Sequence, residues 1–326
     1  MLVAVLLFIL GFVLLIKGGD WFVDGATGIA HRFHVPELLI GATVVSIGTT
    51  LPEVMVSATS AVSGHGQIAY GNAIGSVICN TALIAALTIA IKPAPVDKKS
   101  FKTPVLFFFL SAAFYLFNAY VLGEFTRLSG AILLAIFVVY IALQVRNAIK
   151  HPEAVPVEPE EGEEEQKKEN PFWKDVVLLI VGAALIAVGA DLLVDNGTII
   201  ATELGVPESV IALTFVALGT SLPELVTAIT ALVKGHGALS LGNVVGANMF
   251  NLVLVSGLSI LLQPFNLPVE KTINGMNASL VVDIPVMMFV MLFLTVPALI
   301  KGKLSRYQGI ILLVVYAAFC TFQFVA

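Results

Sequence analysis

The stretch Gly41-Ala-Thr-Val-Val-Ser-Ile-Gly-Thr-Thr-Leu-Pro-Glu53 decides the fold, because the chain contains it twice. It returns as Ala212-Leu-Thr-Phe-Val-Ala-Leu-Gly-Thr-Ser-Leu-Pro-Glu224. An alignment of Pro52 with Pro223 needs no gap and makes about 20 of about 50 positions identical, far more than a shared apolar composition would give. We interpret the chain as an internal duplication.

The composition indicates an integral membrane protein. Hydrophobic residues make up 58% of the chain and charged residues only 12%, where a soluble domain would carry about 25% charged residues. The chain has only Cys79 and Cys320, far apart and both within apolar runs, which argues against a disulfide or metal framework. We expect no cofactor and no nucleic acid partner, no obligatory protein partner is evident, and the lipid bilayer is the expected surrounding.

The apolar runs predict an all-α integral membrane protein with about ten transmembrane helices in two inverted five-helix repeats. Residues 1–150 would form the first membrane repeat, 151–170 an acidic cytoplasmic linker, and 171–326 the second, inverted repeat. The predicted spans are 2–30, 36–62, 68–91, 104–121, 128–145, 173–201, 207–233, 239–261, 280–300 and 307–324.

The distribution of Lys and Arg predicts the orientation. With the N-terminus outside, the predicted outer loops hold only Arg127 and Lys271, and the cytoplasmic loops hold the remaining basic residues except Lys17, which lies on the first span. Since basic loops stay in the cytoplasm, both termini should lie outside the cell inner (plasma) membrane. An odd number of spans in each half then inverts the second half, and inverted repeats are typical of transporters that alternate between inward-open and outward-open states.

The linker 151–170 is rich in Glu and Pro and cannot bury a core. A solvated connection between the repeats is the favoured interpretation. A calcium sensor is the alternative, but calcium sensors need ligands at fixed loop positions and a glycine turn.

Glu53 and Glu224 carry the expected chemistry, because a carboxylate in the middle of a span is costly and each half has one at the same position. On a helix, hydroxyl residues would share the face of each glutamate. These companions are Ser46, Thr49 and Thr50 in the first repeat and Ala217, Thr220 and Ser221 in the second. Pro52 and Pro223 lack the N–H that would bind the carbonyls of Gly48 and Gly219.

Carboxylate, hydroxyl and carbonyl oxygens are hard donors suited to Na+ and Ca2+. The plainer alternative is that the hydroxyls satisfy backbone carbonyls while the prolines kink the helices for packing, which is common in membrane helices. The duplication of the whole constellation favours an ion site.

The following helix of each half adds a second layer. Ser76 and Asn80 lie four residues apart on one helical face, and Ala247 and Asn251 are their counterparts. The asparagines would coordinate an ion or water, or else form interhelical hydrogen bonds. Two further groups are interpreted as structural: the Gly pairs, which would allow close helix approach, and the asparagines near the helix starts. These residues are Gly71, Gly75, Gly242 and Gly246, and Asn72 and Asn243.

These motifs resemble the two α-repeats of cation/calcium exchangers, and most closely the prokaryotic sodium/calcium exchangers. The resemblance rests on Gly-Thr-Thr-Leu-Pro-Glu and Gly-Thr-Ser-Leu-Pro-Glu, each followed by a Gly-Asn-x-x-Gly helix. It implies a secondary antiporter, not an enzyme, in which spans two, three, seven and eight enclose the ions while spans one and six move. It also implies the ligands. Glu53 and Glu224 would bind Ca2+, with oxygens from Thr49, Thr50, Thr220, Ser221, the carbonyls of Ser46 and Ala217, and Ser76, Asn80 and Asn251.

Two departures from the family pattern affect the expected stoichiometry. Many members carry aspartate at the position of Asn251 and serine at that of Ala247, so this chain lacks one ionisable group and one donor. We expect electrogenic calcium extrusion driven by Na+. The alternative is an H+/Ca2+ or other divalent cation antiporter, whereas a channel would need a ring of like residues. A hydrolase would need a nucleophile and a base, and all five histidines are expected in loops.

Overall fold

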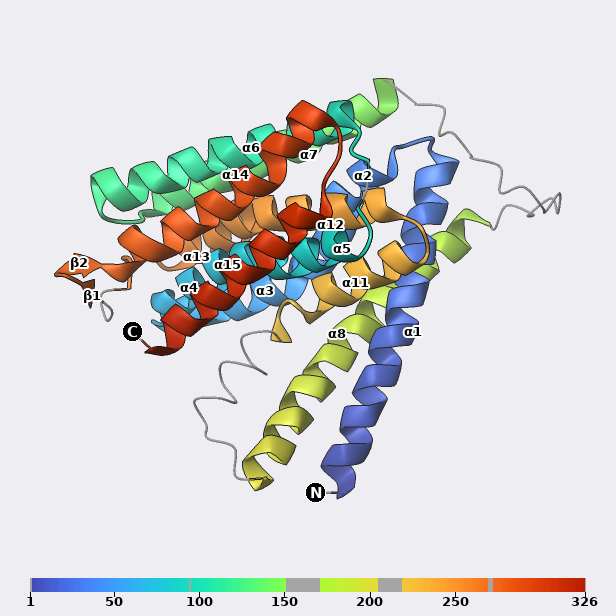
Figure 1. Ribbon diagram of the computed structural model, residues 1–326, viewed down its shortest axis with the longest axis horizontal. Helices are drawn as coiled ribbons and strands as arrows, with labels where there is room; N and C mark the ends of the chain where they lie inside the picture. The colour runs from blue at the N-terminus through green and yellow to red at the C-terminus, as the bar shows by residue number, and fades with distance from the viewer. Residues whose placement is uncertain (1, 94, 151–170, 205–218, 269–271, 326) are drawn as a thin grey trace.

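The computed structural model describes residues 2–93, 95–150, 171–204, 219–268 and 272–325, and nearly all of them are helical (Figure 1). Labels with η mark π-helical segments. The elements are α1 (Leu2–Arg32), α2 (Glu37–Ile40), η1 (Gly41–Val45), α3 (Ser46–Val62), α4 (Gly66–Cys79), η2 (Asn80–Ala85), α5 (Ala86–Ile91), α6 (Lys98–Phe117), η3 (Asn118–Leu122), α7 (Arg127–Lys150), α8 (Phe172–Glu203), α11 (Leu222–Val233), α12 (Gly237–Phe250), η5 (Asn251–Val255), α13 (Ser256–Leu262), β1 (Thr272–Ile273), β2 (Met276–Asn277), η6 (Ser279–Asp283), α14 (Ile284–Lys301) and α15 (Arg306–Val325).

The prediction of an all-α membrane protein is confirmed. Within the described residues, 8 helical runs are long and apolar enough to cross a membrane. Two further predicted spans are not among these 8. The span 307–324 corresponds to α15, and the described part of the span 207–233 contains α11. The predicted count of ten is therefore approximately consistent with the structure. Residues 207–218 of that span and the predicted linker 151–170 lie outside the described residues.

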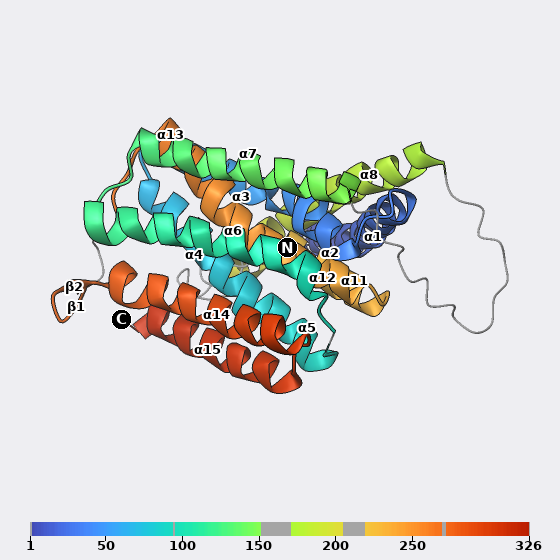
Figure 2. The ribbon, with the colours of Figure 1, turned by 90° about the horizontal axis from the view of Figure 1, so that it is seen from above.

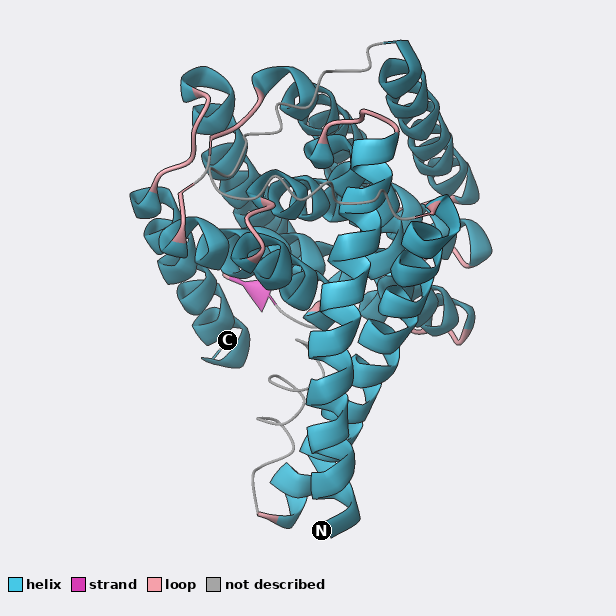
Figure 3. Ribbon diagram, turned by 90° about the vertical axis from the view of Figure 1, so that its right-hand side faces the viewer, coloured by secondary structure: helices cyan, strands magenta, loops and turns pink. Residues whose placement is uncertain are grey.

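Helices α1 and α8 form a long antiparallel pair beside the other helices (Figures 1 and 3). Glycines let their backbones touch, since a Cβ at Gly11 would lie 2.9 Å from the carbonyl oxygen of Gly189, and one at Gly18 would lie 2.9 Å from that of Gly182. The sequence alignment pairs Gly11 with Gly182 and Gly18 with Gly189, so each contact maps onto the other. A reciprocal pattern of this kind is what a two-fold relation between inverted halves produces.

The remaining helices pack around α4 and α12, with α6, α7, α14 and α15 on the outside (Figure 2). Of the predicted glycine contacts, those on α12 are present. A Cβ at Gly242 would lie 2.2 Å from the carbonyl oxygen of Leu38, and one at Gly246 would lie 2.3 Å from Oγ of Ser46. At these two glycines α12 packs closely against the segment from α2 to the start of α3.

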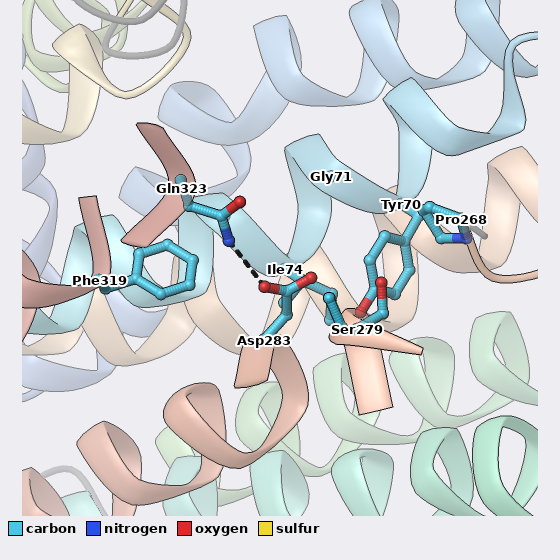
Figure 4. A pocket seen from close by; sticks show the side chains of 10 residues that line it. Tyr70, Gly71, Ile74, Pro268, Ser279, Asp283, Phe319 and Gln323 are labelled. Carbon is cyan, nitrogen blue, oxygen red and sulfur yellow. Dashed lines mark hydrogen bonds between the residues drawn. The ribbon is translucent and has the colours of Figure 1, made fainter. Parts of the chain in front are cut away.

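Gly71 and Gly75 on α4 do not form the predicted seam with any described residue within 4 Å. They instead line a cavity of about 370 Å³ between α4, η6 and α15 (Figure 4). Asp283 also lines it, and its Oδ1 accepts a hydrogen bond from Nε2 of Gln323 at 2.8 Å. That bond ties η6 to α15.

Polar pairs join the two halves at one end of the bundle. His236 lies in the loop between α11 and α12, as expected, and its Nδ1 lies 2.7 Å from Oε1 of Glu37. Lys234 Nζ lies 2.8 Å from Oδ1 of Asp24 and 3.5 Å from Oδ1 of Asp20. Each pair connects the start of the first repeat with the loop after α11.

The prediction of helices alone also missed the hairpin β1–β2. Its strands pair Thr272 with Asn277 and Ile273 with Met276. The turn is Asn274-Gly275, with φ values of 50° and 79°, the conformation that Asn-Gly favours in two-residue hairpins. The dipeptide was visible in the sequence.

Candidate cation-binding site

Two glutamates lie in the interior of the helical bundle. Glu53 on α3 and Glu224 on α11 are each 0% exposed. Thr50, one turn before Glu53, donates from its hydroxyl to Oε1 of Glu224 at 3.5 Å. The structure thus brings together the duplicated motifs of the two repeats.

The two motifs differ in backbone conformation. In the first repeat, Ser46, Thr49, Thr50 and Glu53 lie on one continuous helix, with Pro52 inside it. In the second, α11 begins only at Leu222, so Thr220 and Ser221 precede the helix. The expectation of a common helical face is therefore confirmed for the first motif only. Ala217 lies outside the described residues.

Glu224 occupies the first turn of α11, directly after Ser221 at the N-cap. The first backbone N–H groups of a helix carry a partial positive charge that favours a carboxylate. Pro223 fits this position because a proline in the first turn removes only an N–H that has no partner inside the helix. The helix start thus places and stabilises the carboxylate of Glu224.

The second layer comes from π-helical turns that the sequence analysis did not predict. Asn80 is the first residue of η2, which packs against α11, and Asn251 is the first residue of η5, which packs against α3. Each asparagine thus begins a π-helical turn that packs against the helix carrying the glutamate of the opposite repeat. Single π-helical turns are frequent at functional sites. Ser76 is buried one turn before Asn80, and Ala247 is its buried counterpart.

Buried oxygen atoms without partners are concentrated in this constellation. Each of the following atoms is inaccessible and has no hydrogen-bond partner among the described residues: Oε1 and Oε2 of Glu53, Oε2 of Glu224, Oγ of Ser221, and Oδ1 of Asn80 and Asn251. Buried polar atoms in proteins are almost always paired, so a group of exceptions needs an explanation, and a bound ion or ordered water is one. The atoms are oxygens of the type that Na+ and Ca2+ prefer.

The arrangement does not favour a transition metal. No group of three or more His, Cys, Asp or Glu side chains is gathered anywhere in the described part of the chain. The charge of the constellation comes from two carboxylates, with neutral hydroxyl and amide oxygens around them. That combination suits alkali and alkaline-earth cations, which bind oxygen and exchange ligands quickly.

Asn72 and Asn243 were interpreted as structural, yet they contact the proposed ligands. Oδ1 of Asn243 accepts hydrogen bonds from Thr49 at 3.2 Å and from Ser46 at 3.3 Å. Oδ1 of Asn72 accepts one from Thr220 at 3.2 Å. The signal in the sequence was the duplication itself, since the alignment pairs Asn72 with Asn243 as well as Thr49 with Thr220.

Membrane-spanning helices, two reciprocal halves and a buried cluster of oxygen atoms where the halves meet define a secondary cation transporter. The chain belongs to the sodium/calcium exchanger protein family, whose model matches residues 3–146 and 174–325. It is a cation/Ca2+ exchanger and not an enzyme, as the sequence resemblance indicated.

Similar proteins cover almost the whole chain. The sodium/calcium exchanger MaX1 of Methanosarcina acetivorans is 32% identical, with 98% of both chains covered. A putative antiporter, CaxA of Alkalimonas amylolytica, is 37% identical, also with 98% of both chains covered. The solved structure of the exchanger NCX_Mj, soaked with 2.5 mM Na+ and 0.1 mM Ca2+, is similar with a TM-score of 0.78 at 33% identity and covers 98% of this chain and 97% of its own.

Proposed function

We propose that this protein exchanges Na+ for Ca2+ at one site built around Glu53 and Glu224. The observation that supports the proposal is the cluster of buried, unpartnered oxygens on and around the two glutamates. Leaving so many polar atoms unpaired in the membrane interior would cost several kcal/mol. A bound cation supplies the missing partner for all of them.

The proposed ligands come from both repeats. Glu53 and Glu224 bind Ca2+, and neutral oxygens complete the Ca2+ and Na+ sites. The neutral donors are the hydroxyls of Thr49, Thr50, Thr220, Ser221 and Ser76, the amide oxygens of Asn80 and Asn251, and the backbone carbonyls of Ser46 and Ala217. Asn251 in place of a carboxylate keeps an oxygen donor without adding charge.

Charge balance explains why exchange would be obligatory. Two carboxylates carry about two negative charges, which one Ca2+ or two to three Na+ compensate. The empty site would have to cross with two unpaired charges, so the loaded states switch more readily. If three Na+ move per Ca2+, one net charge crosses the membrane, worth about 2.3 kcal/mol per 100 mV.

We also propose the orientation and the moving parts. Residues 1–150 and 171–326 form the two inverted repeats, both termini lie outside the cell membrane, and the linker 151–170 is cytoplasmic. The paired helices α1 and α8 slide against the other helices to open the site to either side. The reciprocal glycine contacts between α1 and α8 support this, because they let the pair move as one unit.

The hydroxyl-rich surroundings of the glutamates favour Na+ over H+ as the coupling ion. A proton needs only a carboxylate, whereas Na+ needs several neutral oxygens at once. Thr49, Thr50 and Ser221 are buried beside the carboxylates, and a proton carrier would have no use for them.

The experiment is calcium uptake into proteoliposomes. The protein is reconstituted in vesicles loaded with Na+ and diluted into Na+-free buffer at equal pH, with radioactive Ca2+ outside and a proton ionophore present. Uptake that requires internal Na+ and disappears in Glu53→Gln supports the proposal, and Glu124→Gln, in an exposed loop, is the matched control. Uptake that ignores Na+ and follows an imposed pH gradient without the ionophore would assign the protein to the H+/Ca2+ branch.

A further inference from the structure

We propose that Asn72 and Asn243 are positioning residues, each of which fixes the direction of a threonine hydroxyl in the opposite repeat so that its lone pairs face the cation. The proposal rests on the proposed function, since it assigns Thr49 and Thr220 their direction as ligands. It concerns side chains outside the proposed ligand set.

The amide of Asn72 has only one orientation that satisfies its neighbours. Nδ2 lies 3.3 Å from the backbone carbonyl oxygen of Glu53 and 2.9 Å from Oγ of Ser57. A carbonyl oxygen can only accept, so the atom beside it must be the nitrogen. Oδ1 of Asn72 therefore faces Thr220, and the threonine must donate across the 3.2 Å that separates them.

Asn243 makes the equivalent contact in the other direction. Its Oδ1 lies 3.2 Å from Oγ1 of Thr49 and 3.3 Å from Oγ of Ser46, and Asn243 itself is 0% exposed. The repeat alignment pairs Thr220 with Thr49 and Asn72 with Asn243, so the two hydrogen bonds are equivalent. Both bonds cross between the repeats and have the same length, so the arrangement obeys the internal symmetry of the molecule.

A threonine hydroxyl has one proton and two lone pairs. A cation attracts the lone pairs and repels the proton, so a hydroxyl that rotates freely is a weaker ligand than one whose proton is held elsewhere. An amide oxygen that accepts the proton from behind turns the lone pairs toward the ion and increases their negative charge, since hydrogen bonds in a chain polarise each other. The asparagines would thus prepare the threonines before the ion arrives.

The effect should be larger for Na+ than for Ca2+. Na+ carries half the charge and depends more on neutral oxygens, whereas Ca2+ gains most of its binding from the two carboxylates. Removing the amide acceptor should therefore weaken Na+ binding by about tenfold, the value of one hydrogen bond of about 1.4 kcal/mol, and Ca2+ binding by less. A residue that only fills space would change both affinities together or neither.

The experiment measures ion binding to the purified full chain by thermal unfolding in detergent at increasing Na+ or Ca2+ concentration. Asn72→Ser shortens the side chain so that it no longer reaches Thr220. Thr220→Val removes the donor, and the double variant of Asn72→Ser with Thr220→Val completes a double-mutant cycle. The same set at Asn243 and Thr49 tests the other half independently.

The expected result is an about tenfold weaker apparent Na+ affinity in Asn72→Ser, and a double variant that binds Na+ no more weakly than Thr220→Val alone. Ser57→Ala is the matched control, because it removes the other side-chain partner of Asn72 without touching Thr220, and its Na+ affinity should stay at the wild-type value. Effects that add fully in the double variant, or equal losses for Na+ and Ca2+, would overturn the proposal.

Failure of the proposed function looks different. A wild-type protein stabilised by neither Na+ nor Ca2+ would overturn both proposals. Normal ion binding in the wild type, loss of Ca2+ binding in Glu53→Gln and unchanged Na+ affinity in both asparagine variants would overturn only the positioning role.

Discussion

Thr50 of the first repeat donates from its hydroxyl to Oε1 of Glu224 of the second repeat, across 3.5 Å. Both side chains are 0% exposed. The bond therefore lies inside the protein, where water does not compete for either group. It places a hydroxyl of one half directly beside a carboxylate of the other, and so joins two motifs that lie far apart in the sequence.

Thr50→Val should lower the apparent Ca2+ affinity by about tenfold, because it removes a charge-assisted hydrogen bond worth about 1.5 kcal/mol or more and also a ligand oxygen. Valine has nearly the same shape, so the fold should persist. Thr59→Val is the control, since Thr59 lies on the same helix, is exposed, and donates only to α3 carbonyls. Calcium-dependent stabilisation against heat measures both variants, and an unchanged affinity in Thr50→Val would remove Thr50 from the site.

Gly18→Ala should separate α1 from α8. The added Cβ would lie 2.8 Å from the backbone nitrogen of Ile186 and 2.9 Å from the carbonyl oxygen of Gly182, and backbone atoms cannot move aside as a side chain can. We expect a loss of about 1–3 kcal/mol in stability, the usual range for overpacking. Val13→Leu, on the exposed side of α1, should leave the melting temperature unchanged. Equal melting temperatures in both variants would contradict the close contact.

Lys234→Met should have a modest effect on exchange. Lys234 bridges to Asp24 at 2.8 Å and to the backbone oxygen of Asp20 at 3.0 Å, which links α1 to the loop after α11. The side chains are partly exposed, so the bridge is worth about 0–1 kcal/mol and can change state populations by at most about fivefold. The difference from wild type should shrink at high ionic strength, where such pairs are screened. A loss of exchange that no added choline chloride reduces would indicate a different role for Lys234.

Asp97 should stabilise the start of α6. Its carboxylate accepts from the backbone N–H groups of Ser100 at 2.9 Å and Lys99 at 3.2 Å. Partial burial raises the pKa of Asp97, but the hydrogen bonds from Ser100 and Lys99 and the charge of Lys99 lower it further, so the net pKa lies below its ordinary value. Asp97→Ala should cost about 1 kcal/mol of stability at neutral pH.

The same residue gives a pH dependence with a definite sign. Because the pKa of Asp97 is lowered in the folded state, its charge-dependent stabilisation is complete above the ordinary aspartate pKa and is lost as the pH falls through the lowered value. Asp97→Asn keeps an N-cap acceptor but cannot titrate. The melting temperatures of wild type and Asp97→Asn should therefore converge at acidic pH, and a gap that stays constant from pH 7 downward would contradict the assignment.

Much of the fold and part of the site could be predicted from the sequence, because both depend on patterns that repeat. The apolar runs gave the class and approximate number of helices, and the duplicated Leu-Pro-Glu motif identified the two glutamates that the structure buries together. The prediction that Gly242 and Gly246 allow close helix approach was also correct, since only small residues allow such contact.

The contacts between repeats could not be predicted in the same way. Helical periodicity relates residues on one helix, and it gives no information about which side chain of a distant segment lies opposite. Asn243 meets Thr49 because the inverted halves pack reciprocally, and Lys234 meets Asp24 because α1 packs against α11. The π-helical turns at Asn80 and Asn251 were missed for a related reason, since they are local rearrangements stabilised by tertiary packing.

Ala228→Ser should stabilise the protein, because the amide nitrogen of Asn72 has a side-chain hydrogen-bond acceptor and that of Asn243 has none among the described residues. Nδ2 of Asn72 donates to Oγ of Ser57 at 2.9 Å, whereas Nδ2 of Asn243 is buried without a partner among the described residues. The repeat alignment pairs Ser57 with Ala228, a fully buried residue on α11, so the second half lacks the hydroxyl that satisfies the first. Serine at this position would supply that acceptor.

The expected gain is about 1 kcal/mol, the net value of one buried hydrogen bond, visible as a higher melting temperature of the purified protein. Asn243→Ser in the Ala228→Ser background should abolish the gain, because the donor is then absent. Ala231→Ser is the control, since Ala231 is equally buried on the same helix one turn later and its hydroxyl would not be aligned with Ser57. A lower melting temperature in Ala228→Ser than in Ala231→Ser would mean that the two halves do not pack their asparagines alike, and that the symmetry of the site ends at the threonine bonds.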